Sequence, residues 1–174
     1  EEPAIHDVWN WSLELQGQSL ARINPVAQAL GRLQESEGAG DKWNSVFSVL
    51  TELYVNALDH GVLRLESCLK QSASGFAEYF AERDRRLESL TAGSVALYLQ
   101  HIRLPQGGRL QVRIEDSGAG FDYQYWLKKA DTSHTDQLCG RGIRLVTELC
   151  ESINYTNNGA SVEVVCVYST ADSV

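Results

Sequence analysis

The spacing of the apolar residues changes at Gly93, and this change is the strongest constraint on the fold. Before Gly93 the apolar residues mostly recur at the spacing of a helix. After it, SVALYLQHIRL (94–104) and RLQVRIED (109–116) alternate apolar and polar residues, and PQGG joins them. Such alternation indicates half-buried strands, and a short glycine-containing link indicates a hairpin. The chain therefore predicts helices first and paired strands later.

The two ends of the chain add strands to this hairpin. Residues 8–16, VWNWSLELQ, alternate well enough for a first strand, and INYTNNGASVEVVCVY (153–168) predicts two strands around an Asn-Asn-Gly turn. The resulting order is strand, helices, hairpin, helix and hairpin. Such segregation indicates an α+β fold class: a two-layer sandwich with helices packed on one face of a mainly antiparallel mixed sheet.

Two amphipathic helices are predicted after the first strand. The first begins with Ser19 as its N-cap and carries an apolar stripe, although Pro25 would weaken or shift its start. The second begins with Asp41 as its N-cap and ends at Gly61, a natural helix stop. The stripe of the first helix consists of Leu20, Ile23, Val26, Ala27, Leu30 and Leu33, and the buried side of the second of Trp43, Val46, Phe47, Leu50, Leu53, Tyr54, Ala57 and Leu58.

The remaining segments read as a long helix, a loop and a shorter helix. Residues 64–90 predict a long amphipathic helix that Gly75 could break. KKADTSHTDQ (128–137) has little apolar content and predicts a mobile loop. GRGIRLVTELCESI (140–153) predicts a helix whose inward side holds Ile143, Val146, Leu149 and Cys150. No repeat divides the chain, so we expect a single domain over residues 1–174.

Charge and composition narrow the class of partner. The net charge of -8 and the pI near 5.0 argue against nucleic acid or an anionic membrane as the main partner. Arg83, Arg85 and Arg86 alternate with acidic residues, which predicts a salt-bridged, solvent-facing helix. The sequence has no long apolar run or signal peptide, and its four cysteines form no CxxC pair, so we expect a cytoplasmic protein with reduced thiols. Because the chain lacks Met even at position 1, we expect it to be a fragment of a longer one.

A polar stripe interrupts the second helix in TELYVNALDHG (51–61). At about 100° per residue, Glu52, Asn56 and Asp59 would share one narrow stripe. Taken alone, the stripe could be the solvated side of an amphipathic helix. However, apolar residues cover much of the helix circumference, and polar groups are costly to bury unless they have hydrogen-bonding partners. A carboxylate and a carboxamide one turn apart suit a hydrated Mg²⁺ that also binds phosphate oxygens.

Two glycine-containing turns follow in the second half. Asp116-x-Gly118-x-Gly120 could be an ordinary turn, but the Asp could also accept a hydrogen bond from a base amino group beside backbone that a ligand can approach closely. The segment Gly140-Arg141-Gly142 could be a flexible cap, but free N–H groups at a helix start also hold phosphate. Together with the polar stripe, these turns indicate a nucleotide site.

Three segments resemble the motifs of a known family. ELYVNALDHG, IEDSGAGFD and GRGIRLVTEL are similar to the N box and the two glycine boxes of the GHKL ATPases, which have the Bergerat ATP-binding fold. The Glu-x3-Asn-Ala-x2-His-Gly form of the first motif most resembles the anti-sigma factor serine/threonine kinases. It is similar in particular to the kinase-like domain fused behind a receiver and a PP2C-type phosphatase in some bacterial regulators. The likeness covers most of the chain.

The resemblance implies a role for each motif residue. Asn56 would bind Mg²⁺, Glu52 would be the general base beside the γ-phosphate of ATP, and His60 would help hold the triphosphate. Asp116 would bind the adenine amino group, and residues 130–139 would form the ATP lid. The other expected ATP-binding residues are Gly118 and Gly120 around the adenine, and Gly140, Arg141 and Gly142 along the phosphates.

The sequence departs from this family in two places. The anti-sigma factor kinases commonly carry an arginine just before the second glycine box, where this chain has Leu138 or Cys139, so Arg141 or Arg144 would have to replace it. The separation of Asn56 from Asp116 is also long, which makes residues 64–92 a predicted helical insertion. This insertion would be a solvated support helix or, alternatively, an interaction or dimer surface.

The resemblance implies an Mg-ATP-dependent protein serine/threonine kinase that phosphorylates a STAS-type anti-sigma factor antagonist in a bacterial partner-switching pathway. A homodimer is expected, and a sigma factor is a further candidate partner. The departure ahead of Gly140 supports an alternative, a non-catalytic ATP-binding module that sequesters a sigma factor or an antagonist. A histidine-kinase catalytic domain is a third alternative, but residues 1–40 contain nothing like its phospho-accepting helical hairpin.

Overall fold

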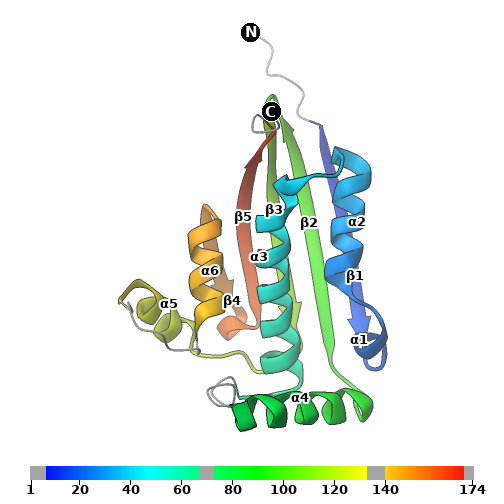
Figure 1. The fold of residues 1–174 in the computed structure, drawn as a ribbon, viewed down its shortest axis with the longest axis vertical. Coiled ribbons are helices and arrows are strands. Elements are labelled where there is room, and N and C mark those ends of the chain that lie inside the picture. The colour runs from blue at the N-terminus through cyan, green and yellow to red at the C-terminus, as the bar shows by residue number, and fades with distance from the viewer. Residues whose placement is uncertain (1–6, 67–72, 133–139, 171–174) are drawn as a thin grey trace.

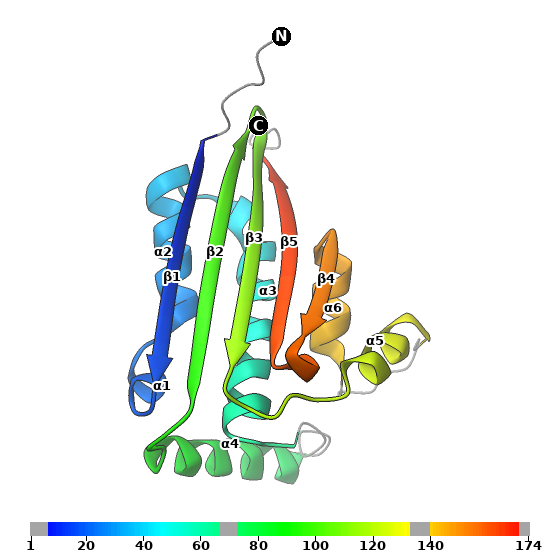
Figure 2. The ribbon, with the colours of Figure 1, turned by 180° about the vertical axis from the view of Figure 1, so that it is seen from behind.

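The computed structural model describes residues 7–66, 73–132 and 140–170, which form a two-layer α+β sandwich (Figure 1). Helices α2 (Pro25–Glu37), α3 (Asn44–Val55) and α6 (Arg141–Leu149) cover one face of a five-stranded sheet. Seen from behind, the described part of the chain places no helix over the opposite face (Figure 2). The predicted fold class is confirmed.

The sheet has the order β1-β2-β3-β5-β4, and each described pair of neighbours is antiparallel. Its register places Leu97, Ile114 and Val162 side by side across three strands. These positions belong to the alternating apolar set, and the whole set therefore faces the helices. The strands are β1 (Val8–Gln16), β2 (Ser94–Leu104), β3 (Gly107–Asp116), β4 (Ser152–Thr156) and β5 (Ser161–Ser169), as the alternation and the turn sequences predicted.

The first helix begins later than predicted, because Pro25 sets its start. Residues Ser19–Arg22 form only the short helix α1, and Ile23 at the break is 39% exposed. Asn24, rather than Ser19, is the N-cap of α2, and its side chain accepts hydrogen bonds from the amides of Val26 and Ala27. The first residue of a helix has no partner within the helix for an amide hydrogen. Proline lacks this hydrogen, so Pro25 favours a helix that starts at residue 25.

The start of α3 also differs from the prediction. Asp41 does not cap α3; it lies in the first turn of the 3₁₀-helix η1 (Asp41–Trp43). Phe47 was predicted to be buried but is 50% exposed. Val46 and Leu50 occupy the sheet-facing side of α3. Phe47 follows Val46, and because each residue along a helix turns the side chain by about 100°, Phe47 points away from the sheet.

The helix does not stop at Gly61. It continues from α3 as the π-helix η2 (Asn56–Val62), so the predicted end is wrong. The amide of Leu63 donates to the carbonyl of Leu58, five residues earlier, at 2.8 Å. This wide turn accommodates one extra residue, and such turns occur frequently at functional sites.

Helix α4 (Ala73–Glu88) lies across the ends of α3 and the sheet (Figures 1 and 2). It runs through Gly75 without a break, whereas residues 64–66, predicted to be helical, are irregular. Its basic cluster is not wholly solvent-facing, because Arg83 pairs with the buried carboxylate of Asp59. Arg85 and Arg86 pair with Glu82 on the same helix, as predicted. Whether residues 64–92 are an insertion stays a prediction.

Two segments after β3 also differ. The predicted loop 128–137 is wrong in its first half, because helix α5 (Tyr123–Thr132) continues through residue 132; residues 133–137 lie outside the described part. The partly buried side chains of Tyr123 and Leu127 pack against the core and hold α5 in place. Helix α6 ends at Leu149, earlier than predicted, because the chain turns into β4. Within the described residues, no helix has the length and apolar content needed to cross a membrane.

Candidate functional site

A cavity of about 430 Å³ lies where α3, η2, the end of β3 and the start of α6 meet, a volume typical of small-molecule sites. It gathers residues from all three sequence motifs, which are far apart along the chain. The predicted site residues that line it are Glu52, Asn56, His60, Asp116, Gly120, Gly140, Arg141 and Gly142. Gly118 does not line it; its amide instead donates to the Asp116 carboxylate beside the cavity.

The polar stripe of the N-box helix divides into two sets. Glu52, Asn56 and His60 line the cavity, whereas Asp59 is only 2% exposed and contacts α4. The predicted common stripe is therefore wrong for Asp59. The reason is the change from α-helix to π-helix at Asn56, because the wider turn separates side chains three residues apart more than an α-helix does.

Gly61 sets the distance between η2 and β3. A Cβ atom at this position would lie 2.5 Å from Cγ of Asp116, closer than real Cβ atoms approach. The glycine is therefore needed for close approach of η2 to the Asp116 side chain, rather than for ending a helix. It brings the N box and the first glycine box together at one edge of the cavity.

Asp116 is a half-buried carboxylate at this edge. Its Oδ1 accepts a hydrogen bond from the amide of Gly118 at 2.8 Å. Burial raises the pKa of Asp116 to about 6, although the hydrogen bond from Gly118 opposes this shift. The carboxylate is therefore charged near neutral pH but incompletely compensated. A ligand that donates a hydrogen bond would stabilise it.

Aromatic side chains line the cavity at positions that the motifs did not predict. Phe121, Tyr155 and Trp126 all contribute to the wall. The rings of Phe121 and Tyr155 meet edge to face with centroids 5.4 Å apart, and both line the same cavity as Asp116 and Gly120. Phe121 directly follows the DSGAG turn, a signal that could have identified it, whereas Trp126 stands between Tyr125 and Leu127 and has no comparable signal.

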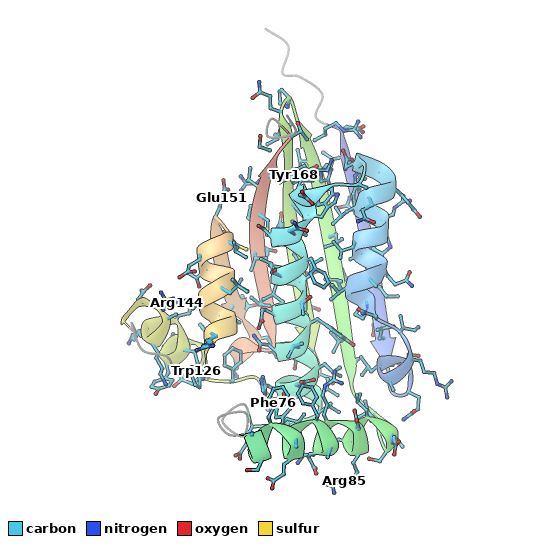
Figure 3. All side chains as sticks on the ribbon, viewed as in Figure 1. Phe76, Arg85, Trp126, Arg144, Glu151 and Tyr168 are labelled. Atoms are coloured by element: carbon cyan, nitrogen blue, oxygen red, sulfur yellow. The ribbon has the colours of Figure 1, made fainter. Side chains whose placement is uncertain are left out.

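The other end of the cavity is the start of α6. Gly140 is the N-cap residue, with a left-handed backbone at φ 85°, and the Trp126 ring packs directly against it. Trp126 lies between α5 and α6 in Figure 3. The first amides of a helix have no partner within the helix, and together with the helix dipole they favour an anion.

Glu52 reaches this same end from α3. A Cβ atom at position 142 would collide with Oε2 of Glu52, so the carboxylate lies directly against the backbone of Gly142. Glu52 and the start of α6 therefore share one small region, although 90 residues separate positions 52 and 142. A group bound at the start of α6 would have a carboxylate beside it.

Two further polar side chains have defined surroundings. Nδ1 of His60 lies 2.6 Å from the carbonyl of Leu65. Because a carbonyl only accepts, Nδ1 carries the hydrogen and Nε2 is left for other partners. Arg141 lines the cavity, whereas Arg144 is not among its lining residues and pairs with Glu148 at 2.9 Å. Leu138 and Cys139, and most of the predicted lid 130–139, lie outside the described residues.

Comparison with protein-family models matches residues 16–166 to the histidine kinase-like ATPase domain. This match covers most of the chain. The chain belongs to the histidine kinase-like ATPase family. The resemblance to GHKL ATPases is thereby confirmed at the level of the family, while the anti-sigma factor kinase subtype stays a prediction. A search of the curated proteins found no match.

Domains of the histidine kinase-like ATPase family bind ATP, usually with Mg²⁺, and the cavity has the chemistry for both. It offers a carboxylate and aromatic surface at one end and a helix start at the other. Asn56 and Glu52 present an amide and a carboxylate on its wall, the oxygen donors that Mg²⁺ takes. No group of three acidic, histidine or cysteine side chains that could hold a metal occurs among the described residues.

Proposed function

We propose that the chain is an Mg-ATP-dependent protein serine/threonine kinase of the anti-sigma factor kinase type. Its substrate is a Ser or Thr hydroxyl on a STAS-type antagonist of an anti-sigma factor, within a bacterial partner-switching pathway in the cytoplasm. The position of the Glu52 carboxylate against Gly142, at the start of α6, carries the proposal. A base for the attacking hydroxyl has to lie beside the terminal phosphate, and this carboxylate lies beside the predicted phosphate site.

The adenine end of the cavity determines which nucleotide binds. Asp116 accepts a hydrogen bond from the 6-amino group of adenine, which partly compensates the buried charge that raises its pKa. Phe121 and Tyr155 provide apolar surface for the base, beside the backbone of Gly120. A guanine would present a carbonyl oxygen to the same carboxylate, so the site favours ATP over GTP.

The phosphate end positions the reacting groups. The amides at the start of α6 and the Arg141 guanidinium bind the phosphates, and Arg141 takes the place of the arginine that the family commonly has ahead of Gly140. Asn56 holds Mg²⁺, which when bound offsets phosphate charge. Glu52 accepts the proton of the attacking hydroxyl as the phosphoryl group transfers.

A non-catalytic ATP-binding module is the second candidate, and one observation favours it. The chain has Leu138 and Cys139 where the anti-sigma factor kinases commonly have the arginine that contacts the terminal phosphate. Such a module would hold a sigma factor or an antagonist in a nucleotide-dependent manner and leave ATP intact. We propose a homodimer in either case.

Labelled ATP and a STAS-type antagonist distinguish the two candidates. We expect Mg²⁺-dependent phosphate transfer to the antagonist by the wild type. Glu52→Gln keeps the size of the side chain and should retain ATP binding while losing transfer. Nucleotide-dependent capture of the antagonist without any transfer would favour the binding module. Equal transfer by Glu52→Gln and wild type would show that Glu52 is not the base.

A further inference from the structure

The side of η2 that faces away from the cavity is held by α4. Asp59 is 2% exposed, and both of its carboxylate oxygens accept a hydrogen bond from this helix. The Tyr79 hydroxyl donates to Oδ2 at 2.7 Å, and Nε of Arg83 donates to Oδ1 at 2.8 Å. Burial and the hydrogen bond to Asp59 raise the pKa of Tyr79, so its hydroxyl remains protonated and available as a donor.

The end of η2 is held by the same helix. Nη1 of Arg86 donates to the carbonyl of Leu63 at 2.6 Å and to that of Arg64 at 3.1 Å. Tyr79, Arg83 and Arg86 lie four and three residues apart, so they project from one face of α4. This face contacts the π-helix at its middle through Asp59 and at its exit through two carbonyl groups.

The exit from η2 has an unfavourable backbone conformation. Arg64 has a φ of 55°, a region that costs free energy for a residue with a side chain. Next to it, the amide of Leu65 donates to the carbonyl of Asp59 at 2.8 Å, and the carbonyl of Leu65 accepts from His60. Conformations of this kind persist when surrounding contacts hold them in place. Arg86 on α4 supplies such contacts.

On this basis we propose that Asp59 is a positioning residue of the nucleotide site, held by Tyr79 and Arg83 so that η2 presents Asn56 and His60 to the metal and phosphates. The inference rests on the proposed Mg-ATP site. Helix α4 is then more than a solvated support, because it determines the geometry of the turn that carries the metal-binding side chain. Loss of its contacts should weaken Mg²⁺-dependent nucleotide binding more than metal-free binding.

The test compares two arginines on the same helix. Arg83→Met removes the contact to Asp59, and Arg85→Met makes the same substitution at an arginine on the side of α4 turned away from the sheet (Figure 3). ATP affinity is titrated for each with Mg²⁺ and with chelator, alongside thermal melting. We expect Arg83→Met to lose about tenfold in affinity with Mg²⁺ and less than about twofold without it, and Arg85→Met to match the wild type.

A second variant keeps the inference testable if Arg83→Met does not fold. Tyr79→Phe removes one hydroxyl but keeps the fully buried ring, so the packing is preserved. We expect a loss of a few fold in Mg²⁺-dependent affinity and faster hydrogen exchange at the amides of Leu63 and Leu65. These amides bond within or beside η2 and report its order directly.

The outcomes separate this inference from the proposed function. If wild type binds Mg-ATP and both Arg83→Met and Tyr79→Phe retain its Mg²⁺ dependence, the positioning role is overturned while the ATP site stands. Equal losses with and without Mg²⁺ would also overturn it, because they would indicate general destabilisation. If wild type binds no ATP, the proposed function and the inference both fail.

Discussion

Asp59 belongs to the π-helix η2 and Asp116 lies against it, and the surroundings of these two carboxylates are opposite. Asp59 is almost wholly buried and has a hydroxyl and a guanidinium as partners on α4. Asp116 lines the cavity and accepts, among the described residues, one hydrogen bond from a backbone amide. The comparison separates two environments: a fully paired buried carboxylate is costly to deprive of its partners, whereas an incompletely compensated one at a cavity has capacity for a ligand.

The largest expected effect is on stability and should appear at only one of the two carboxylates. Asp59→Ala would leave Arg83 and Tyr79 without their partner, and we expect the free energy of unfolding to fall by about 3–5 kcal/mol. Asp116→Ala should not lower it and should raise it if anything, because a raised pKa means that the ionised Asp116 disfavours the folded state. Urea denaturation at pH 7.5 measures both; similar losses at the two sites would contradict the distinction.

The next effect concerns the approach of η2 to Asp116. Gly61→Ala would place a methyl group against the Asp116 carboxylate, and relieving such overlap typically costs about 1–3 kcal/mol. We therefore expect ATP affinity to fall roughly 10- to 100-fold in a titration. Gly31→Ala is the matched control, because nothing lies within 4 Å of a Cβ atom there. An unchanged affinity of Gly61→Ala would show that the Asp116 position is not critical.

The pKa of Asp116 predicts a pH dependence. ATP binding needs the ionised carboxylate as the stronger acceptor, so affinity should fall, by up to about tenfold per pH unit, as the pH drops below about 6. The ligand-free protein should change in the opposite direction. Its folded-state pKa exceeds the ordinary value of 3.8, so unfolding free energy is lost as the pH rises between 3.8 and about 6.

Asp116→Asn isolates this titration from that of the nucleotide phosphates. The variant should lack the contribution of residue 116 to both pH profiles, while the phosphates contribute equally in the two proteins. Binding titrations and melting curves from pH 5 to 8 give the comparison. Superimposable profiles for wild type and Asp116→Asn would mean that this carboxylate does not titrate in the range.

The smallest effect tests the choice between two arginines on α6. Arg141→Gln should lower ATP affinity about tenfold, because a charge-assisted hydrogen bond to phosphate is lost. Arg144→Gln should change it by less than about twofold, since Arg144 pairs with Glu148 and is not among the lining residues. The reverse ranking in the same titration would make Arg144 the phosphate ligand.

The sheet and the cavity could be predicted because their signals are local. Alternation identifies a strand within a few residues, and each motif places its polar groups on one short segment. The helix starts were less predictable, although Asn24 before Pro25 was a local signal for the true cap. The exposure of Phe47 depends on which side of α3 packs on the sheet, which no local spacing determines.

The role of Asp59 could not be predicted for a different reason. Helical spacing put it with Glu52 and Asn56, and only the widening of the helix at Asn56 separates them. Its partners Tyr79 and Arg83 lie 20 and 24 residues later, on a helix whose packing direction no local pattern reveals. Trp126 is a similar case, because its contact with Gly140 follows from the way α5 packs on α6.

The most direct test of the central claim is a calorimetric titration of ATP, with Mg²⁺, into wild type and Asp116→Ala. If Asp116 binds the adenine amino group, wild type should bind ATP and strongly prefer it to GTP. Asp116→Ala should lose about 10- to 100-fold in ATP affinity and most of this preference, while its melting temperature does not fall below that of wild type. Equal ATP affinity in the two proteins would contradict the assignment of the adenine site.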